Sequence, residues 1–283
     1  MKQIYQLAFL ISILFIAISC NGRPSSWHQN KVTNKISPEF EDIKKELVNL
    51  SDFPTDKEGF ICLFDGKSLK GWRGYGKNHL PEKWSIDNET LVLHSSGTKE
   101  GGDIIFASPF KNFELELEWK ISKGGNSGIF YLAREIMTKD INDKSRLEPI
   151  YMSALEYQIL DDENHPDAKL GKGNNRISGS LYDIVPAIPQ NAKPFEKWNK
   201  SKIIVNHGHL IHQLNGEKVV ECQLWTSDWK KKLQESKFSE TKWPLAFELM
   251  NNRDENAREG YIGLQDHGHD VWFRHIRIKN ITE

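Results

Sequence analysis

The chain has 283 residues, of which 38% are hydrophobic and 27% charged, a composition that excludes a disordered chain and indicates a folded protein with a buried core. Its formal net charge of −1 argues against a surface built for nucleic acid or for an anionic membrane. Nine Trp, seven Tyr and fourteen Phe favour a β-rich protein and suit the binding of sugar rings.

The N-terminus has the features of an export signal. Lys2 supplies a positive charge, and the apolar run Leu7–Ile18 is too short for a confident membrane span. The residues up to Cys20 resemble a bacterial lipoprotein cleavage site, although an ordinary secretory signal with an incidental cysteine is the alternative. We expect a signal peptide at residues 1–19 and a lipid anchor on Cys20, which would hold the chain in the cell envelope, facing the periplasm.

Residues 20–58 are expected to form a tether and one short helix. The stretch up to Lys35 is polar and has no hydrophobic period. Ser37-Pro38 then reads as a helix N-cap followed by proline in the first turn. Apolar residues from Phe40 to Leu50 follow at helical spacing, so we expect an amphipathic helix that ends near Ser51.

Residues 59–283 alternate between apolar and polar side chains in short runs separated by Gly, Asn and Asp, which is typical of strands. Asn215-Gly216 predicts a tight hairpin, and Ser227 is a candidate cap for one inserted helix over Asp228–Ser236. No helix separates successive strands regularly, so we expect an all-β, antiparallel two-sheet sandwich with one curved sheet whose concave face is open to ligand. The expected strands are Phe60–Phe64, Trp84–Ile86, Thr90–Leu93, Asp103–Phe106, Phe113–Ile121, Ser127–Arg134, Ala154–Leu160, Ser180–Ile184, Ser201–Asn206, His209–Leu214, Lys218–Gln223, Tyr261–Gln265 and Val271–Lys279.

Two cysteines lie within this domain. Cys62 and Cys222 both fall in strand-like segments, and in an exported protein they can form one disulfide. A buried free thiol packs equally well in such a strand, so both alternatives stay open.

Two strand-like segments carry polar groups on one face. In Tyr151–Asp162, Glu156 and Gln158 point away from Tyr157 and its apolar neighbours, and Gly263–Arg274 has the same character. Polar side chains on a covered sheet face cost several kcal/mol unless they are paired. We therefore interpret these rows as the floor of a groove for a polar ligand.

Several motifs together resemble the 3-keto-disaccharide hydrolase domain family. They begin with LFDGKSLKGW at Leu63–Trp72 and end with Phe273-Arg274, and they follow the order of the family. The motifs between these two are FELELEWKI (113–121), GNSGIF (125–130), EYQILDD (156–162) with His165, Trp198-Asn199, HQLNG (212–216) and LQDHG (264–268). The chain departs from the family at His275 and over Trp243–Glu259, which leaves the shape of one groove wall open.

The resemblance implies a concanavalin-like jelly roll and action on glycosides that are already ketones at sugar carbon 3. Such a ketone makes the hydrogen on carbon 2 acidic. A base removes that proton, the enolate expels the substituent at carbon 1, and water then adds. This scheme needs a base, an acid for the leaving oxygen and a group that holds the enolate charge. A divalent metal is a possible cofactor for the last task.

Glu156 and His267 are the leading catalytic candidates. Glu156 lies on the polar face of its strand, and the His267 imidazole titrates near neutral pH. Glu118 is a further candidate because it lies close to the turn at Gly124, although alternating glutamates more often form a solvated surface. Tyr182 is a candidate proton donor to the leaving oxygen.

Further residues are candidates for binding the substrate or a metal. His212 has leucines on its own face and can equally be an interior histidine, while Trp198 can stack on sugar or belong to the core. The remaining candidate substrate ligands are Asn126, Gln158, Gln265, Asp266 and Arg274, and the weak candidate metal ligands are Asp161, Asp162 and His165.

The function we expect is therefore cleavage of 3-keto-glycosides by elimination and hydration. A carbohydrate-binding module on the same fold is the alternative, because fold alone does not fix activity. A conventional glucanase would need two carboxylates spaced across one groove-facing strand. Glu114, Glu116 and Glu118 offer such a row but lack the aspartate that usually lies between them.

Overall fold

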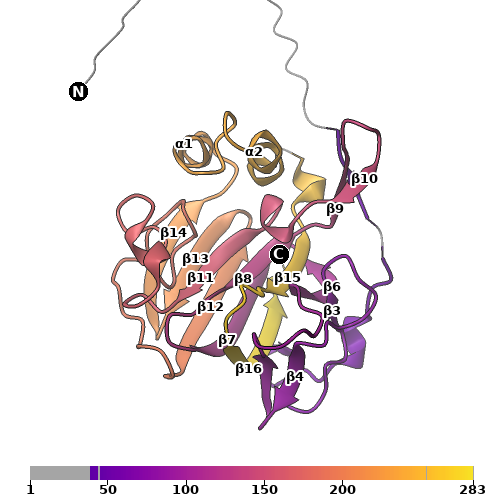
Figure 1. The fold of residues 1–283 in the computed structure, drawn as a ribbon, viewed down its shortest axis with the longest axis vertical. Helices are drawn as coiled ribbons and strands as arrows, with labels where there is room; N and C mark the ends of the chain where they lie inside the picture. Colours follow the sequence, from indigo (N-terminus) through magenta and orange to yellow (C-terminus); the bar gives the residue numbers. More distant parts are fainter. Residues whose placement is uncertain (1–38, 44, 253, 283) are drawn as a thin grey trace, which may run out of the picture. The chain divides into compact units, whose positions relative to one another are not determined.

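Two antiparallel sheets that share one hydrophobic core make up most of the protein (Figure 1). The computed structural model describes residues 39–43, 45–252 and 254–282. These described residues form one compact unit. The signal peptide, most of the tether, Cys20 and the Ser37 cap lie outside the described residues. Within those residues, no helix is long and apolar enough to cross a membrane.

The larger sheet has eight strands. Its path runs through β14 (Glu217–Gln223), β13 (His209–Leu214), β12 (Asn199–Asn206), β7 (Phe113–Ile121), β16 (Val271–Asn280), β5 (Thr90–Leu93) and β4 (Trp84–Asp87), and β2 (Ile61–Cys62) pairs with β16. The second sheet has the order β11 (Leu155–Leu160), β8 (Asn126–Ala133), β15 (Gly260–Leu264), β6 (Ile104–Phe110) and β3 (Trp72–Gly74). A small third sheet joins β1 (Glu41–Asp42), β9 (Ile136–Lys139) and β10 (Ser145–Leu147).

The period of two along each strand decides which side chains enter the core. Leu117 and Trp119 of β7 lie in one cluster with Tyr157 and Ile159 of β11, so these faces of the two sheets meet. Each such side chain contributes about 1.5–3 kcal/mol through burial. The intervening residues, such as Glu156 of β11, must therefore point away from the core.

Two helices lie side by side at one end of the sandwich (Figure 1). Helix α1 (Ser227–Glu235) is capped by Thr226, whose hydroxyl accepts the Trp229 N–H at 3.2 Å, so the cap lies one residue before the expected one. Helix α2 (Pro244–Asn251) is a second inserted helix that the sequence did not predict, and it begins at a proline. The short 3-10 turns are η1 (Leu50–Asp52), η2 (Ile150–Met152), η3 (Pro166–Lys169) and η4 (Glu255–Ala257).

The predicted N-terminal helix is wrong for the described residues. The short strand β1 and the turn η1 form there instead, because the backbone bonds to neighbouring segments: the Ile43 N–H donates to the Glu135 carbonyl and the Val48 N–H to the Ala107 carbonyl. The predicted strand Ser180–Ile184 is also wrong. This segment is a turn in which Leu181 forms isolated bridges to Tyr157 and Val185, and the pairing does not extend into a strand.

The predicted hairpin is confirmed. Asn215 and Gly216 have φ values of 50° and 90° between β13 and β14, the left-handed pair that a tight hairpin turn requires. Cys62 and Cys222 are both free thiols in this structure, and Cys222 is buried in the core.

Candidate active site

The polar outer face of β11 forms the floor of a cavity of about 130 Å³. Strand β8 and the residues that follow β15 complete the floor, and the connection between α1 and α2 supplies one wall. The cavity is lined by Asn126, Tyr151, Glu156, Gln158, Tyr182, Lys237, Trp243, Gln265 and His267. Six of the nine are residues that the sequence singled out, drawn from four separate segments of the chain.

Glu156 is the buried carboxyl group of this cavity, with 7% of its surface exposed. Its side chain lies over Gly128 of β8, where an added Cβ would come within 2.4 Å of Glu156 Oε1. Burial raises the pKa of Glu156 well above its usual range, although the Lys237 ammonium opposes this shift. At neutral pH the raised pKa favours a protonated carboxyl group, which is suited to donate a proton.

Lys237, Trp243 and Tyr151 are cavity residues that sequence reasoning missed. The Lys237 ammonium lies 4.2 Å from the centroid of the Tyr182 ring and 5.4 Å from that of Trp243. Burial lowers the pKa of Lys237, while the Glu156 carboxylate opposes this shift. Tyr151 lies 5.7 Å from Trp243 and is 36% exposed at the rim. The segment Trp243–Glu259 was noted as a departure from the family pattern, and of its residues Trp243 lines the cavity.

Three carboxamides line the floor. Gln158 Nε2 donates to Asn126 Oδ1 at 3.3 Å. The Oε1 atoms of Gln158 and Gln265 are buried and have no hydrogen-bond partner among the described residues. A buried unsatisfied carbonyl costs about 1–3 kcal/mol. Both oxygens thus keep an unused acceptor position just beneath the cavity surface, which a hydroxyl-rich ligand reaches once the amide side chains rotate toward it.

His267 stands at the exposed edge of the cavity within a cluster of three imidazoles. Its ring centroid is 6.3 Å from that of His165 and 5.9 Å from that of His269. Partial burial of the ring, followed by repulsion from His269, lowers the pKa of His267, so the neutral form that acts as a base predominates at pH 7. Asp266 does not orient this ring: its carboxylate accepts the backbone N–H groups of Gly102 and Gly268, at 2.8 and 3.0 Å.

Tyr182 belongs to a network of partly buried charged side chains. Its hydroxyl donates to Asp167 Oδ2 at 2.9 Å, and Arg176 binds both Asp167 and Asp183 at 2.8 and 2.7 Å. Asp183 in turn accepts the backbone N–H of Lys237 at 2.6 Å. Burial, together with the hydrogen bond to Asp167, raises the pKa of Tyr182. The network thus holds Tyr182 and Lys237 in one wall.

His212 does not reach the cavity. It is fully buried between the sheets, where its Nε2 pairs with the Tyr131 hydroxyl at 2.8 Å and its Nδ1 with the Gly179 carbonyl at 2.9 Å. Burial lowers its pKa to about 4. The structure therefore gives His212 the interior position that its flanking leucines allowed.

Glu118, Arg274 and Trp198 gather on the opposite side of the sandwich. Arg274 binds Glu118 Oε2 through Nε at 2.8 Å and through Nη2 at 2.7 Å, and its guanidinium lies 4.1 Å from the Trp198 ring centroid. Glu118 projects from β7 away from the core, and Glu156 projects from β11 away from the same core. The two carboxyl groups therefore cannot act on one substrate.

Asp161, Asp162 and His165 do not form a metal-ligand set. Asp161 Oδ2 accepts from the Gly124 N–H and from Asn164, and Asp162 Oδ1 accepts from Ser178. Across residues 39–43, 45–252 and 254–282, no group of three or more His, Cys, Asp or Glu side chains is arranged to hold a metal ion. These side chains instead fix the loop that follows β11.

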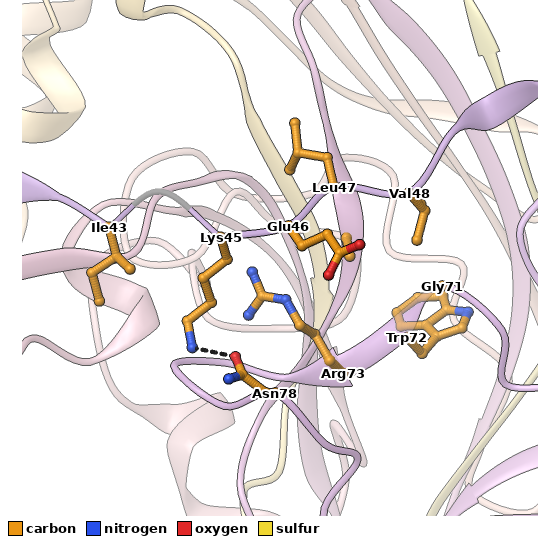
Figure 2. A pocket seen from close by; sticks show the side chains of 10 residues that line it. Ile43, Lys45, Glu46, Leu47, Val48, Gly71, Trp72, Arg73 and Asn78 are labelled. Carbon is orange, nitrogen blue, oxygen red and sulfur yellow. Dashed lines mark hydrogen bonds between the residues drawn. The ribbon is translucent and has the colours of Figure 1, made fainter.

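A larger hollow of about 670 Å³ lies between residues 45–48 and β3, and it contains none of the catalytic or binding residues that the sequence predicted. Figure 2 shows Lys45 extending to Asn78 across this hollow. Arg73 forms a bidentate pair with Glu135 at 2.6 and 2.8 Å, so the buried charge here is already neutralised. The smaller cavity holds the acid, base and free acceptors that chemistry needs, and we regard it as the candidate active site.

Known proteins resemble this chain in sequence and in fold. The model of the 3-keto-alpha-glucoside-1,2-lyase-like domain matches residues 59–279. A protein of Bacteroides thetaiotaomicron named 3-keto-disaccharide hydrolase is 52% identical over 286 residues, which cover 98% of each chain. A crystal structure from Parabacteroides distasonis, provisionally assigned as a glycosyl hydrolase, has a TM-score of 0.64 at 26% identity over 80% of this chain and 95% of that one. A second structure from that organism, of the same assignment, has a TM-score of 0.56 at 28% identity over 78% and 99%.

Proposed function

The chain belongs to the family of 3-keto-alpha-glucoside-1,2-lyase-like domains, and we propose that it cleaves the glycosidic bond of sugars oxidised to a ketone at carbon 3. The name of its Bacteroides relative supports hydrolysis of a 3-keto-disaccharide. The observation that carries the proposal is the meeting of Glu156 and His267 in one cavity whose floor bears the free oxygens of Gln158 and Gln265.

We infer that the reaction is an elimination followed by hydration. His267, as the neutral imidazole, takes the proton from carbon 2, and the electron pair of that bond forms the enolate. When the pair returns to restore the ketone, a double bond forms between carbons 1 and 2, and the bond from carbon 1 to the leaving oxygen breaks. Water then adds its oxygen to carbon 1 and gives a proton to the ionised acid, while the protonated His267 returns its proton to carbon 2, so both groups regain their starting forms.

Glu156 is assigned as the acid for the leaving oxygen. The carboxyl group is buried and its pKa is raised, so it carries the proton that the leaving oxygen must receive. Tyr182, our other candidate acid, already donates its proton to Asp167, and its raised pKa makes it a poor donor. We assign Tyr182 to positioning the cavity wall.

The carboxamides and the aromatic rim are assigned to binding. Gln158 and Gln265 accept hydrogen bonds from sugar hydroxyls, and Asn126 holds the Gln158 amide in place. The tilted rings of Tyr151 and Trp243 offer apolar faces to a sugar ring or to its leaving group. We further propose that the lipid on Cys20 anchors this domain at the envelope, where it meets exported or imported glycosides.

The test compares a 3-keto glycoside with its unoxidised parent on the purified domain, with and without a chelator. We expect cleavage of the keto sugar alone, with a strong loss of turnover in Glu156→Gln and in His267→Gln. Cleavage of the parent at an equal rate would remove the elimination mechanism. If the keto sugar binds without turnover, the carbohydrate-binding alternative holds. Loss of activity with the chelator would show that a metal takes part.

A further inference from the structure

We propose that Lys237 is the catalytic cation that holds the negative charge of the enolate on the carbon 3 oxygen. This inference rests on the proposed function, because only a 3-keto sugar presents that oxygen. The residue lines the same cavity as Glu156 and His267 and comes from the connection between α1 and α2. An elimination needs such a group, since removal of the carbon 2 proton leaves a full negative charge on the sugar.

The position of Lys237 is fixed by the protein around it. Its backbone N–H donates to Asp183 at 2.6 Å, and the neighbouring Phe238 N–H donates to the Ser236 hydroxyl at 3.0 Å. The ammonium lies 4.2 Å from the Tyr182 ring centroid and 4.9 Å from that of Phe238. Ring faces favour the charged ammonium and limit its motion, so the cation is held ready at the cavity wall.

The charges around Lys237 suit an anion that forms during the reaction. Glu156 faces it across the cavity, and Asp103 and Asp167 lie near Glu156. Asp167 is occupied by Arg176 and by the Tyr182 hydroxyl, and Asp103 accepts the Asp266 N–H at 2.8 Å. With Glu156 protonated, Asp183 and Asp167 are the carboxylates that favour the charged form of Lys237 against burial, and its ammonium is the charge that an enolate oxygen in this cavity would meet.

The roles divide without overlap. His267 receives the carbon 2 proton, Lys237 donates a hydrogen bond to the oxygen that gains the electron pair, and Glu156 gives its proton to the leaving oxygen when the pair returns. No oxidant or further reactant is needed, because the ketone is restored as the bond at carbon 1 breaks.

A substrate that cannot eliminate isolates this step. A 1,5-anhydro sugar oxidised at carbon 3 has no glycosidic oxygen at carbon 1 to expel, so the proposed cleavage cannot follow, and exchange of the carbon 2 hydrogen with D2O, measured by NMR, reports the proton transfer alone. Exchange at carbon 4, which is also next to the ketone, serves as the internal reference. We expect Lys237→Met to slow exchange at carbon 2 by about 10²–10³-fold, the usual effect of losing one oxyanion donor.

Matched variants separate a catalytic role from a structural one. Lys237→Arg keeps the charge and should retain exchange within about tenfold, whereas Lys237→Gln should resemble the Met variant. Lys242→Met removes an exposed lysine from the same connection and should match the wild type. The KM of cleavage should change much less than kcat in all of them. Unfolding midpoints show whether each variant is folded.

Three results would overturn the inference. Wild-type exchange in folded Lys237→Met would show that another group holds the charge. A covalent adduct at Lys237 after borohydride reduction would show that the amine attacks the ketone instead. If the wild type neither exchanges nor cleaves any 3-keto sugar, the proposed function itself fails and the role of Lys237 falls with it.

Discussion

Gly128→Ala should disable the site without unfolding the protein. The added Cβ would lie 2.4 Å from Glu156 Oε1, and ordinary contact begins near 3.4 Å, so the carboxyl group must move by about 1 Å. A displacement of about 1 Å at a reacting group costs on the order of 10²-fold in rate. The backbone itself tolerates alanine, since Gly128 is not in the left-handed region. The overpacking should cost about 1–3 kcal/mol of unfolding free energy. Part of this cost is offset because alanine has less conformational freedom than glycine in the unfolded chain.

The assay is kcat for a 3-keto glycoside, with urea unfolding as the measure of stability. Gly263→Ala in β15 of the same sheet is the control, because its Cβ would meet Ile150 and Ile104 rather than a cavity residue. Glu156→Asp shortens the side chain and withdraws the carboxyl group from residue 128. The double variant Gly128→Ala/Glu156→Asp should therefore have a kcat close to that of Glu156→Asp alone. A Gly128→Ala enzyme that is folded and has wild-type kcat would refute the placement of Glu156 as a reacting group.

Three further results follow from the charges. The kcat/KM profile should fall on the acid side as His267 protonates, with a pKa below the ordinary 6.5 of histidine, and on the alkaline side as Glu156 ionises, with a pKa above that of an ordinary glutamate. His267→Gln should remove the acid limb, and Glu156→Gln the alkaline limb. His212 has a pKa of about 4 in the folded protein and 6.5 in the unfolded chain, so its neutral form stabilises the fold fully above pH 6.5. Roughly 3 kcal/mol of unfolding free energy should be lost as the pH falls to 4. Urea titrations of His212→Gln should lack this pH dependence. Arg274→Ala should leave kcat unchanged and cost at most about 1 kcal/mol of unfolding free energy, and a large loss of activity would place the site on the other sheet.

Most strands could be predicted because one face of each is buried. Phe113–Ile121, Thr90–Leu93 and His209–Leu214 were expected with the bounds that the structure shows, since their alternation is clean and turn residues flank them. The helix predicted in the N-terminal segment did not form, because the spacing of apolar residues does not show that the backbone of this segment will hydrogen-bond to other parts of the chain. The two-residue and three-residue strands β1, β3 and β10 are too short to carry a period, whereas β2 was expected within the longer strand Phe60–Phe64.

The site was predictable only where it lies on regular strands. Glu156 and Gln158 were found from their alternation, and His267 and Gln265 from the polar run after β15. Lys237 and Trp243 were missed because they come from a connection, where no period relates a residue to its neighbours in space. Distant parts of the chain reach the cavity only through tertiary packing, which one sequence does not display.

The same argument explains why two similar glutamates have opposite environments. Glu118 and Glu156 both stand on outward faces of strands, and strand alternation placed both among the catalytic candidates. The register separates them: Glu118 lies opposite Lys200 and Arg274, whereas Glu156 lies opposite Phe130. Cations beside Glu118 hold its pKa below the usual range despite partial burial, while burial prevails at Glu156 and raises its pKa. A carboxyl group that keeps its proton at neutral pH is the one able to protonate a leaving oxygen, so cross-strand pairing, rather than residue type, selects the acid.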